Sequence, residues 1–169
     1  MKLSIKEESE NPVLNIVLDT LSKNKQALVF FNTKKSAEKA AEDISRKIKK
    51  EDSALKELAN DVLKALSKPT RQCERAALCI AKGIAFHHAG LTSKQRNLIE
   101  DNFRKGIIKI ICCTPTLAYG LDLPAYRAII KDLRRFSQRG LTWIPVLEYM
   151  QMCGRAGRPA GRKAAAGRT

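Results

Sequence analysis

Two arginines, Arg155 and Arg158, stand three residues apart, and each directly follows a glycine. At a helix end or on a tight turn, side chains three residues apart face the same side. A guanidinium carries a permanent charge and donates paired hydrogen bonds, which suits it to a triphosphate. The same G-R-x-G-R pattern is also typical of a solvated basic turn or a nucleic-acid patch. The pair is therefore a candidate anion site of either kind.

A second candidate site is the segment TPTLAYGLDLP, residues 114–124, which follows an apolar run. Thr114 and Thr116 supply hydroxyls and backbone amides. Pro115 suits the first turn of a short helix, and the N-terminus of such a helix favours a phosphate. Gly120 permits close approach of a ligand beside Asp122, whose carboxylate is an acceptor suited to a ribose hydroxyl. An ordinary loop with a helix cap has the same composition.

The two histidines of the chain, His87 and His88, are adjacent in the segment FHHAGL. A zinc site requires more ligands at suitable spacing, and the sequence has no C-x-x-C pattern. It also has no G-x-S-x-G nucleophile motif. We therefore predict neither a metal site nor Ser-His-Asp catalysis, and we interpret the cysteines as small buried apolar residues. The five cysteines are Cys73, Cys79, Cys112, Cys113 and Cys153.

The elements that would position these residues follow from apolar periodicity. Short apolar runs predict strands at residues 26–31, 83–90, 107–113 and 127–133. Helical spacing predicts helices at residues 12–21, 32–48 and 91–106. Asn32, Thr33 and Ser36 are possible caps of the second helix; Thr92 and Gln95 fit a capping box, and Gly106 fits a C-cap. Residues 51–82 predict one or two added helices, interrupted at 67–70.

Alternation of apolar strands with helices indicates an α/β fold with a mostly parallel sheet and helices on both faces. Ligands of such sheets bind at the carboxyl ends of the strands. Three polar segments would lie there, and they contain most of the candidate residues. These segments are residues 32–35, 87–91 and 113–124.

The composition bounds the class of protein. A length of 169 residues fits one domain, and 32 basic against 17 acidic residues give a net charge of +15. From Arg127 onward there are ten basic residues and two acidic ones. Such an excess favours a polyanionic partner, with nucleic acid ahead of an acidic membrane surface. No apolar run approaches the roughly 20 residues of a membrane span, so we expect a soluble cytoplasmic, nucleoid-associated protein.

Taken in order with ALVFFNTKKSAE (residues 27–38), the segments FHHAGL, TPTLAYGLDLP and QMCGRAGRP resemble motifs IV, IVa, V and VI of the second RecA-like domain of superfamily 2 helicases. They are more closely similar to the archaeal DNA repair helicases of the superkiller-like group, relatives of the helicase domain of DNA polymerase theta. The resemblance covers residues 11–159, and the run 127–159 is specific to that group. It implies a RecA-like domain over residues 1–159 with a helical insert at about 51–82. We expect residues 160–169 to be a disordered or vector-derived tail.

The resemblance also implies roles for single residues. Arg155 and Arg158 would meet the γ-phosphate of ATP as catalytic residues. Gln151, Gly120 and Asp122 would lie at the nucleotide, with Asp122 at the ribose. The phosphate backbone of a bound strand would be contacted by Asn32, Thr33, His88, Thr114 and Thr116. Two positions depart from the pattern: Asp122 stands where the archaeal group usually has Asn, and Cys153 where a small polar or apolar residue is common.

The family places a strand-separating β-hairpin between motifs V and VI, here at about residues 133–144. Basic Arg134 and Arg135 suit phosphates, and aromatic Phe136 and Trp143 suit an exposed base pair. Arg139 adds a further basic side chain and Gly140 permits the turn. The alternative is a basic surface loop whose aromatic side chains pack on the core.

The sequence contains no G-x-x-x-x-G-K-[ST] loop and no Asp-Glu pair at a strand end. We therefore expect ATP and Mg²⁺ to be held mainly by a first RecA-like domain outside this chain, and the isolated chain to be a monomer without ATP turnover. The leading prediction is the second motor domain of an ATP-dependent 3′–5′ DNA helicase in DNA repair or at stalled forks. Its partners would be single-stranded and forked DNA and the other domains of its own protein. Two alternatives remain open: an RNA helicase domain of the same superfamily and a non-catalytic nucleic-acid-binding module.

Overall fold

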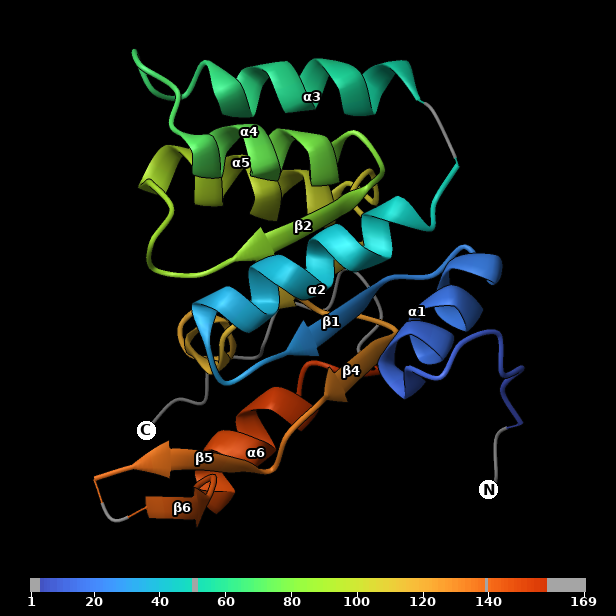
Figure 1. Cartoon of the computed structure of the whole chain (residues 1–169), viewed down its shortest axis with the longest axis vertical. Coiled ribbons are helices and arrows are strands. Elements are labelled where there is room, and N and C mark those ends of the chain that lie inside the picture. Colours follow the sequence, from blue (N-terminus) through green and yellow to red (C-terminus); the bar gives the residue numbers. More distant parts are fainter. Residues whose placement is uncertain (1–3, 50–51, 139, 158–169) are drawn as a thin grey trace, which may run out of the picture.

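A four-stranded parallel sheet forms the centre of the chain (Figure 1). The computed structural model describes residues 4–49, 52–138 and 140–157. The strands lie in the order β2-β3-β1-β4, and every residue of β1, β2 and β3 is buried. This burial explains why the strands are continuous apolar runs rather than alternating ones. Their bounds are β1 Ala27–Phe30, β2 Ile84–His87, β3 Ile110–Cys113 and β4 Arg127–Ile130.

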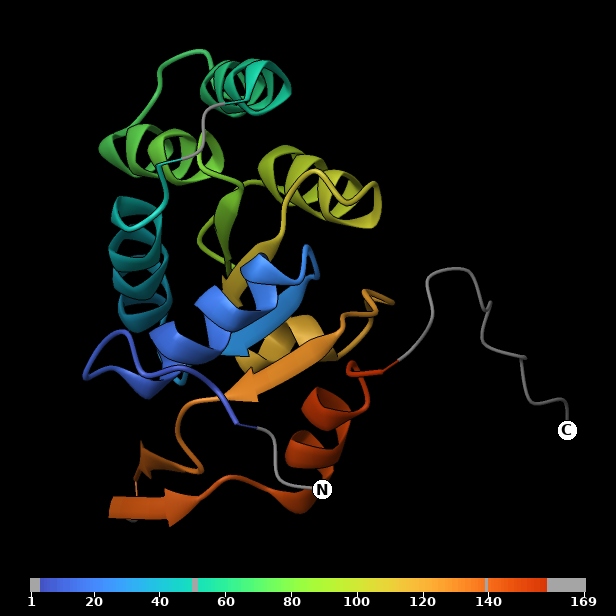
Figure 2. The same ribbon diagram turned by 90° about the vertical axis from the view of Figure 1, so that its right-hand side faces the viewer.

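Helices cover both faces of this sheet, which confirms the predicted α/β class (Figures 1 and 2). α2 and α4 lie on one face, whereas α5 and α6 lie on the opposite one. α1 packs beside β4, where the Arg127 guanidinium donates to the Thr20 hydroxyl at 2.9 Å. The helices are α1 Pro12–Ser22, α2 Lys34–Arg46, α3 Ser53–Leu63, α4 Arg71–Ile80, α5 Ser93–Arg104, the 3-10 helix η1 Pro115–Ala118 and α6 Val146–Cys153.

Side-chain caps fix where several helices begin. The predicted capping box of α5 is confirmed, because the Thr92 hydroxyl accepts from the Gln95 amide and the Gln95 side chain accepts from the Thr92 N–H. Of the three candidate caps of α2, Thr33 is the N-cap and accepts from the Ser36 N–H at 3.1 Å. The C-cap of α5 is Lys105, and Gly106 follows it with a φ of +76°. The prediction of Gly106 as the C-cap was thus wrong by one residue, since the left-handed position follows the cap.

Two additions extend the sheet domain at opposite ends (Figure 1). α3 and α4, the predicted helical insert, pack on each other, and residues 67–70 separate them as expected. At the other end lies a β-hairpin of β5 Arg134–Ser137 and β6 Gly140–Trp143, antiparallel and joined by a short turn. Gly140 has a φ of +89°, which a side chain would strain.

Four of the five cysteines are buried, as predicted, but Cys153 is half-buried at the end of α6. Burial raises the pKa of Cys79 to about 11 and also raises that of Cys112. Both thiols are therefore protonated at neutral pH and act as apolar packing groups.

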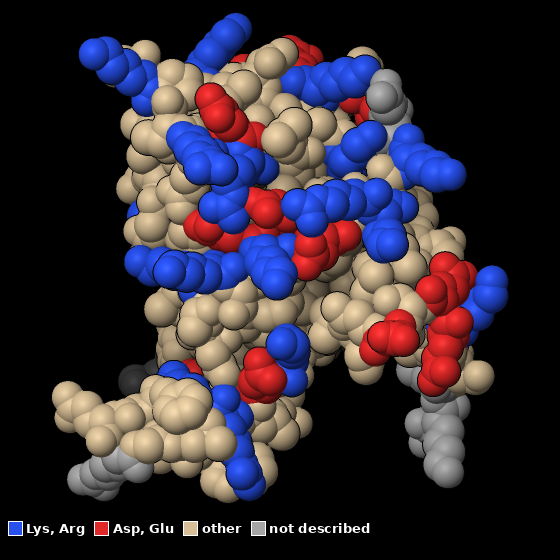
Figure 3. Space-filling view, in the orientation of Figure 1, with Lys and Arg blue, Asp and Glu red and all other residues tan. Residues whose placement is uncertain are grey.

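The charge excess does not form one uninterrupted patch on the face that carries α2 and α4. Lysine and arginine side chains spread over this face, and acidic side chains lie among them (Figure 3). A net charge of +15 therefore gives long-range attraction to polyanions here without defining a single binding surface.

Candidate nucleotide and nucleic-acid site

Three loops with predicted site residues leave the sheet at one edge. β1, β2 and β3 end in register, because Phe30 and His87 both pair with Cys113. The N–H of Phe31 continues this register by donating to the carbonyl of Cys113 at 2.8 Å. The residues that follow the three strands, 32–33, 88–91 and 114–116, therefore start from the same edge, where parallel sheets bind their ligands.

Asn32 and Thr33 follow β1, and both side chains make bonds within the protein. The Asn32 amide nitrogen donates to the main-chain carbonyl of Arg134 at 2.6 Å. The Thr33 hydroxyl caps α2 and also donates to the Ser36 hydroxyl at 2.8 Å. The loop is thereby held in one conformation, with the exposed Thr33 at the start of a helix that favours a bound anion.

Thr114 and Thr116 lie at the start of η1, directly after β3. Their hydroxyl oxygens are 2.9 Å apart, and the Thr114 side chain makes no cap bond to the η1 backbone. Thr116 is exposed and Thr114 is half-buried. The structure therefore brings two adjacent hydroxyls together at the sheet edge, which fits contact with a phosphate.

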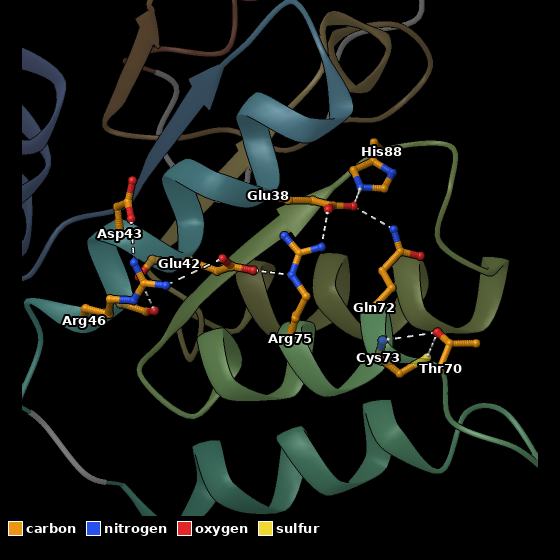
Figure 4. A network of polar contacts seen from close by, with 10 residues as sticks. Glu38, Glu42, Asp43, Arg46, Thr70, Gln72, Cys73, Arg75 and His88 are labelled. Carbon is orange, nitrogen blue, oxygen red and sulfur yellow. Dashed lines mark hydrogen bonds and ion pairs between the residues drawn. The ribbon is translucent and has the colours of Figure 1, made fainter.

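His88 is buried, with 1% of its surface exposed. Its Nδ1 accepts from the Gly90 N–H at 3.0 Å, so the ring proton resides on Nε2, which donates to Glu38 at 2.8 Å (Figure 4). Gln72 and Arg75 of α4 donate to the same carboxylate at 2.7 and 2.8 Å. With both ring nitrogens bonded inside the protein, the ring has no donor left for a phosphate, and only the backbone of this loop can offer one.

The Glu38 carboxylate is the centre of this network. Burial opposes its ionisation, but hydrogen bonds from Gln72 and His88 and the charge of Arg75 outweigh burial and hold the pKa of Glu38 below its ordinary value. Sequence reasoning missed Glu38, although its position on the Ala37–Ala41 stripe of α2 marks it as an inward-facing carboxylate.

Arg155 lies against the η1 segment on the nucleotide side of the candidate site. One guanidinium nitrogen donates to the Asp122 carboxylate at 3.4 Å, and another donates to the carbonyl of Ala118. The Arg155 side chain is 11% exposed and that of Asp122 is 54% exposed. Gly120, with a φ of +81°, lies in sequence between Ala118 and Asp122, the two residues that accept from Arg155. The structure thus brings Gly120, Asp122 and Arg155 together.

Main-chain bonds fix the segment that carries Arg155. The N–H of Ala125 donates to the carbonyl of Arg155 at 2.9 Å, and the N–H of Gly157 donates to Ala125 at 3.0 Å. Gln151 is exposed on α6, one helical turn before Arg155. Arg158 lies outside the residues that the structure describes.

η1 joins the two groups of predicted residues. Its first turn follows Thr114 at the sheet edge, and its last residue, Ala118, supplies the carbonyl that accepts from Arg155. The candidate strand contacts Thr114 and Thr116 therefore lie within one short helical segment of the carbonyl that binds Arg155.

The hairpin exposes its aromatic side chains. Phe136 is 85% exposed and Trp143 is 64% exposed, which excludes the alternative that these rings pack on the core. The guanidinium carbon of Arg134 lies 4.1 Å from the centroid of the Trp143 ring, a cation–π contact. The hairpin therefore exposes two aromatic rings, Phe136 and Trp143, and Arg134 lies over the Trp143 ring.

Arg135, whose side chain is 40% exposed, binds a partner within the protein. Its guanidinium donates to both oxygens of Glu148 at 3.0 Å, and Glu148 is buried on α6. This ion pair ties the hairpin to the helix that leads to Arg155. Sequence reasoning missed Glu148, since a single acidic residue in this segment gives no signal that it is buried or that Arg135 is its partner.

Comparison with known protein families identifies the family to which this chain belongs. Residues 63–160, more than half of the chain, match the helicase conserved C-terminal domain. The chain belongs to the helicase conserved C-terminal domain family. Its parallel sheet with covering helices is the RecA-like architecture that the sequence motifs predicted.

Three relatives of this helicase domain share the name ATP-dependent DNA helicase Hel308. The chain is 47% identical over 164 residues to the ATP-dependent DNA helicase Hel308 of Methanocella arvoryzae, which is 94% of this chain and 22% of that protein. Its identity to Hel308 of Methanococcus vannielii is 43% over 92% of this chain and 21% of the relative. For Hel308 of Pyrococcus horikoshii the identity is 45%, over 91% of this chain and 22% of the relative. The helicase domain thus spans about a fifth of the length of these relatives.

Among residues 4–49, 52–138 and 140–157, no helix is both long and apolar enough to cross a membrane. The same residues contain no group of three or more histidine, cysteine or acidic side chains arranged to bind a metal ion.

Proposed function

We propose that this chain is the second of two RecA-like motor domains of an ATP-dependent 3′–5′ DNA helicase that acts in DNA repair or at stalled forks. Its relatives are named ATP-dependent DNA helicases, so ATP dependence and action on DNA are stated for those proteins. The observation that carries the proposal is η1, which begins at the Thr114 hydroxyl and ends at the carbonyl bound by Arg155. A motor requires such a direct link, because nucleotide turnover must change the grip on the strand.

On the nucleotide side, Arg155 and Arg158 reach the γ-phosphate of ATP, with Gln151 nearby. Gly120 permits close approach of the nucleotide beside Asp122. Arg155 fits this role because a guanidinium has five N–H donors. It can keep the Ala118 carbonyl while it turns from Asp122 to a phosphate. The Asp122 carboxylate then accepts from a ribose hydroxyl. Mg²⁺, when bound, would neutralise charge on the phosphates, and a first RecA-like domain would hold it, since this sequence has no phosphate-binding G-x-x-x-x-G-K-[ST] loop.

On the strand side, Asn32, Thr33, Thr114 and Thr116 contact phosphates, and the loop of His88 contributes through its backbone. Contacts of this kind grip a strand without reading its bases. The +15 charge supplies the long-range attraction. Phe136 and Trp143 meet the end of the duplex, with Arg134 and Arg135 behind them.

The test uses the isolated chain and measures both halves of the proposal. Binding of labelled single-stranded DNA should be weak and should fall steeply with salt, because counterion release contributes most of the affinity. The chain should hydrolyse no ATP. ATP turnover by the chain that survives removal of contaminating ATPases, or no DNA binding at low salt, would contradict the proposal. In the full-length helicase, stronger ATPase stimulation by single-stranded RNA than by DNA would favour the RNA alternative.

A further inference from the structure

A single hydrogen bond connects the loop after β1 to the base of the hairpin. The Asn32 side-chain nitrogen donates to the carbonyl of Arg134 at 2.6 Å, across 102 residues of sequence. Asn32 follows the buried strand β1 and is half-buried, and Arg134 opens β5. The bond therefore runs from the rigid sheet edge to an element that projects from the domain (Figure 1).

The connection continues from Arg134 into the second strand of the hairpin. Arg134 and Trp143 are paired partners in the antiparallel register. The Arg134 guanidinium also lies 4.1 Å from the centre of the Trp143 ring. Asn32, Arg134 and Trp143 thus form an unbroken series of contacts, so a displacement of the Asn32 amide changes the surroundings of the indole.

A second tether holds the hairpin from the other side. Arg135 binds Glu148 of α6, and α6 leads to Arg155. The hairpin is therefore attached both to the strand-side loop, through Asn32, and to the nucleotide side, through Glu148. Neither tether requires DNA to form.

We infer that Asn32 is a positioning residue that couples strand binding at the β1–α2 loop to the orientation of the hairpin. This inference rests on the proposed function, in which that loop grips the strand and the hairpin separates the duplex. A phosphate at the loop takes the Asn32 N–H that otherwise donates to the Arg134 carbonyl. The Arg134 carbonyl then loses its hydrogen-bond donor, and the base of the hairpin shifts as a result.

The experiment uses Trp143, because it is the only tryptophan of the chain and lies at the end of the contact series. The first arm contains no DNA and compares wild type, Asn32→Ala and Asn32→Asp by tryptophan anisotropy and iodide quenching. A net hydrogen bond of ~1 kcal/mol implies about a fivefold rise in the population of released hairpin. Anisotropy should therefore fall and quenching should rise in both variants. Asn60→Ala, at an exposed asparagine on α3, is the matched control and should match wild type.

The second arm adds a short labelled DNA strand and follows the label and Trp143 together. In wild type both signals should change at the same concentration. In Asn32→Ala the label should report weaker binding, because Asn32 is itself a proposed strand contact, and the Trp143 response should be lost even at DNA concentrations that saturate the label signal. Equal Trp143 responses in wild type and variant would overturn the coupling, as would unchanged anisotropy in the first arm.

If the wild-type chain bound no DNA, the proposed function would fail, while the first arm would still decide whether Asn32 holds the hairpin. Should Asn32→Ala fail to fold, Asn32→Asp, which preserves side-chain size, carries the same comparison.

Discussion

The Nε2 of His88 donates to the carboxylate of Glu38 at 2.8 Å and so joins two residues 50 positions apart. Gln72 and Arg75 of α4 complete the shell of this carboxylate. The helical insert is therefore bonded to the same group that positions the loop after β2 (Figure 4).

Glu38→Ala should lower the free energy of unfolding by about 2–4 kcal/mol, because it leaves a buried imidazole N–H and the Gln72 and Arg75 donors without their acceptor. Urea denaturation of the isolated chain measures this. Glu57→Ala, at an exposed position on α3, serves as the control and should stay within ~0.5 kcal/mol of wild type. Similar losses in both variants would show that the network contributes nothing particular to stability.

Stability should also depend on pH through His87. Burial lowers the pKa of His87, although the Glu100 carboxylate 2.7 Å away opposes that shift. As pH falls below the ordinary histidine value of about 6.5, the unfolded chain takes up a proton before the folded chain does. His87 therefore contributes stability at neutral pH that is lost toward its lower folded-state pKa, by at most ~1.4 kcal/mol per pH unit.

Urea denaturation between pH ~7.5 and ~5.5, which brackets the ordinary histidine value, measures this dependence. His87→Gln should flatten it, because glutamine does not titrate. A pH dependence that persists unchanged in His87→Gln would assign it to other groups.

Replacing the aromatic side chains of the hairpin should affect duplex unwinding and ATP hydrolysis differently. In the full-length helicase, Phe136→Ala with Trp143→Ala should reduce duplex unwinding and leave DNA-stimulated ATP hydrolysis largely intact. Both rings are exposed, so the double change should cost the fold less than ~1 kcal/mol. Strand displacement and ATPase assays on one preparation test this, and a parallel fall in both activities would refute the strand-separating role.

Lysine at either arginine of the GRAGR segment should impair catalysis more than binding. Arg155→Lys and Arg158→Lys in the full-length helicase keep the charge but lose the planar fork. Arginine fingers contribute on the order of 10³–10⁵ in rate, so kcat should fall steeply while ATP-analogue affinity changes little. The double change should cost less than the sum of the single ones, because both side chains serve one charge. A fall of less than about tenfold would assign the pair to a DNA-facing basic patch.

Local patterns predicted the elements of the fold well. The continuous apolar runs became the buried parallel strands, and the Thr92–Gln95 capping box starts α5 as expected. Strand bounds were less accurate: the run 107–113 begins as a strand only at Ile110, because the N–H groups of Ile107 and Ile108 bond back to Asn102 of α5.

Partners within the site could not be predicted, because they depend on residues that only the fold brings together. The sequence indicated His88 as a phosphate contact, yet Glu38 takes its only N–H. It indicated Arg135 as an outward-facing cation, yet Glu148 lies buried beneath it. Spacing along one helix or loop reveals which side chains share a face, but not which distant group meets them.

The strand order also determines when the sheet can form during synthesis. β1 and β2 are made first, but they are not neighbours, because β3 lies between them. The chain therefore has no pair of adjacent core strands until Ile110–Cys113 has been made, and β4 joins β1 later still. Until then the apolar runs of β1 and β2 stay unpaired, and closing such long loops slows folding. Nascent chains that end before β3 should thus be the aggregation-prone stage in the biosynthesis of this domain.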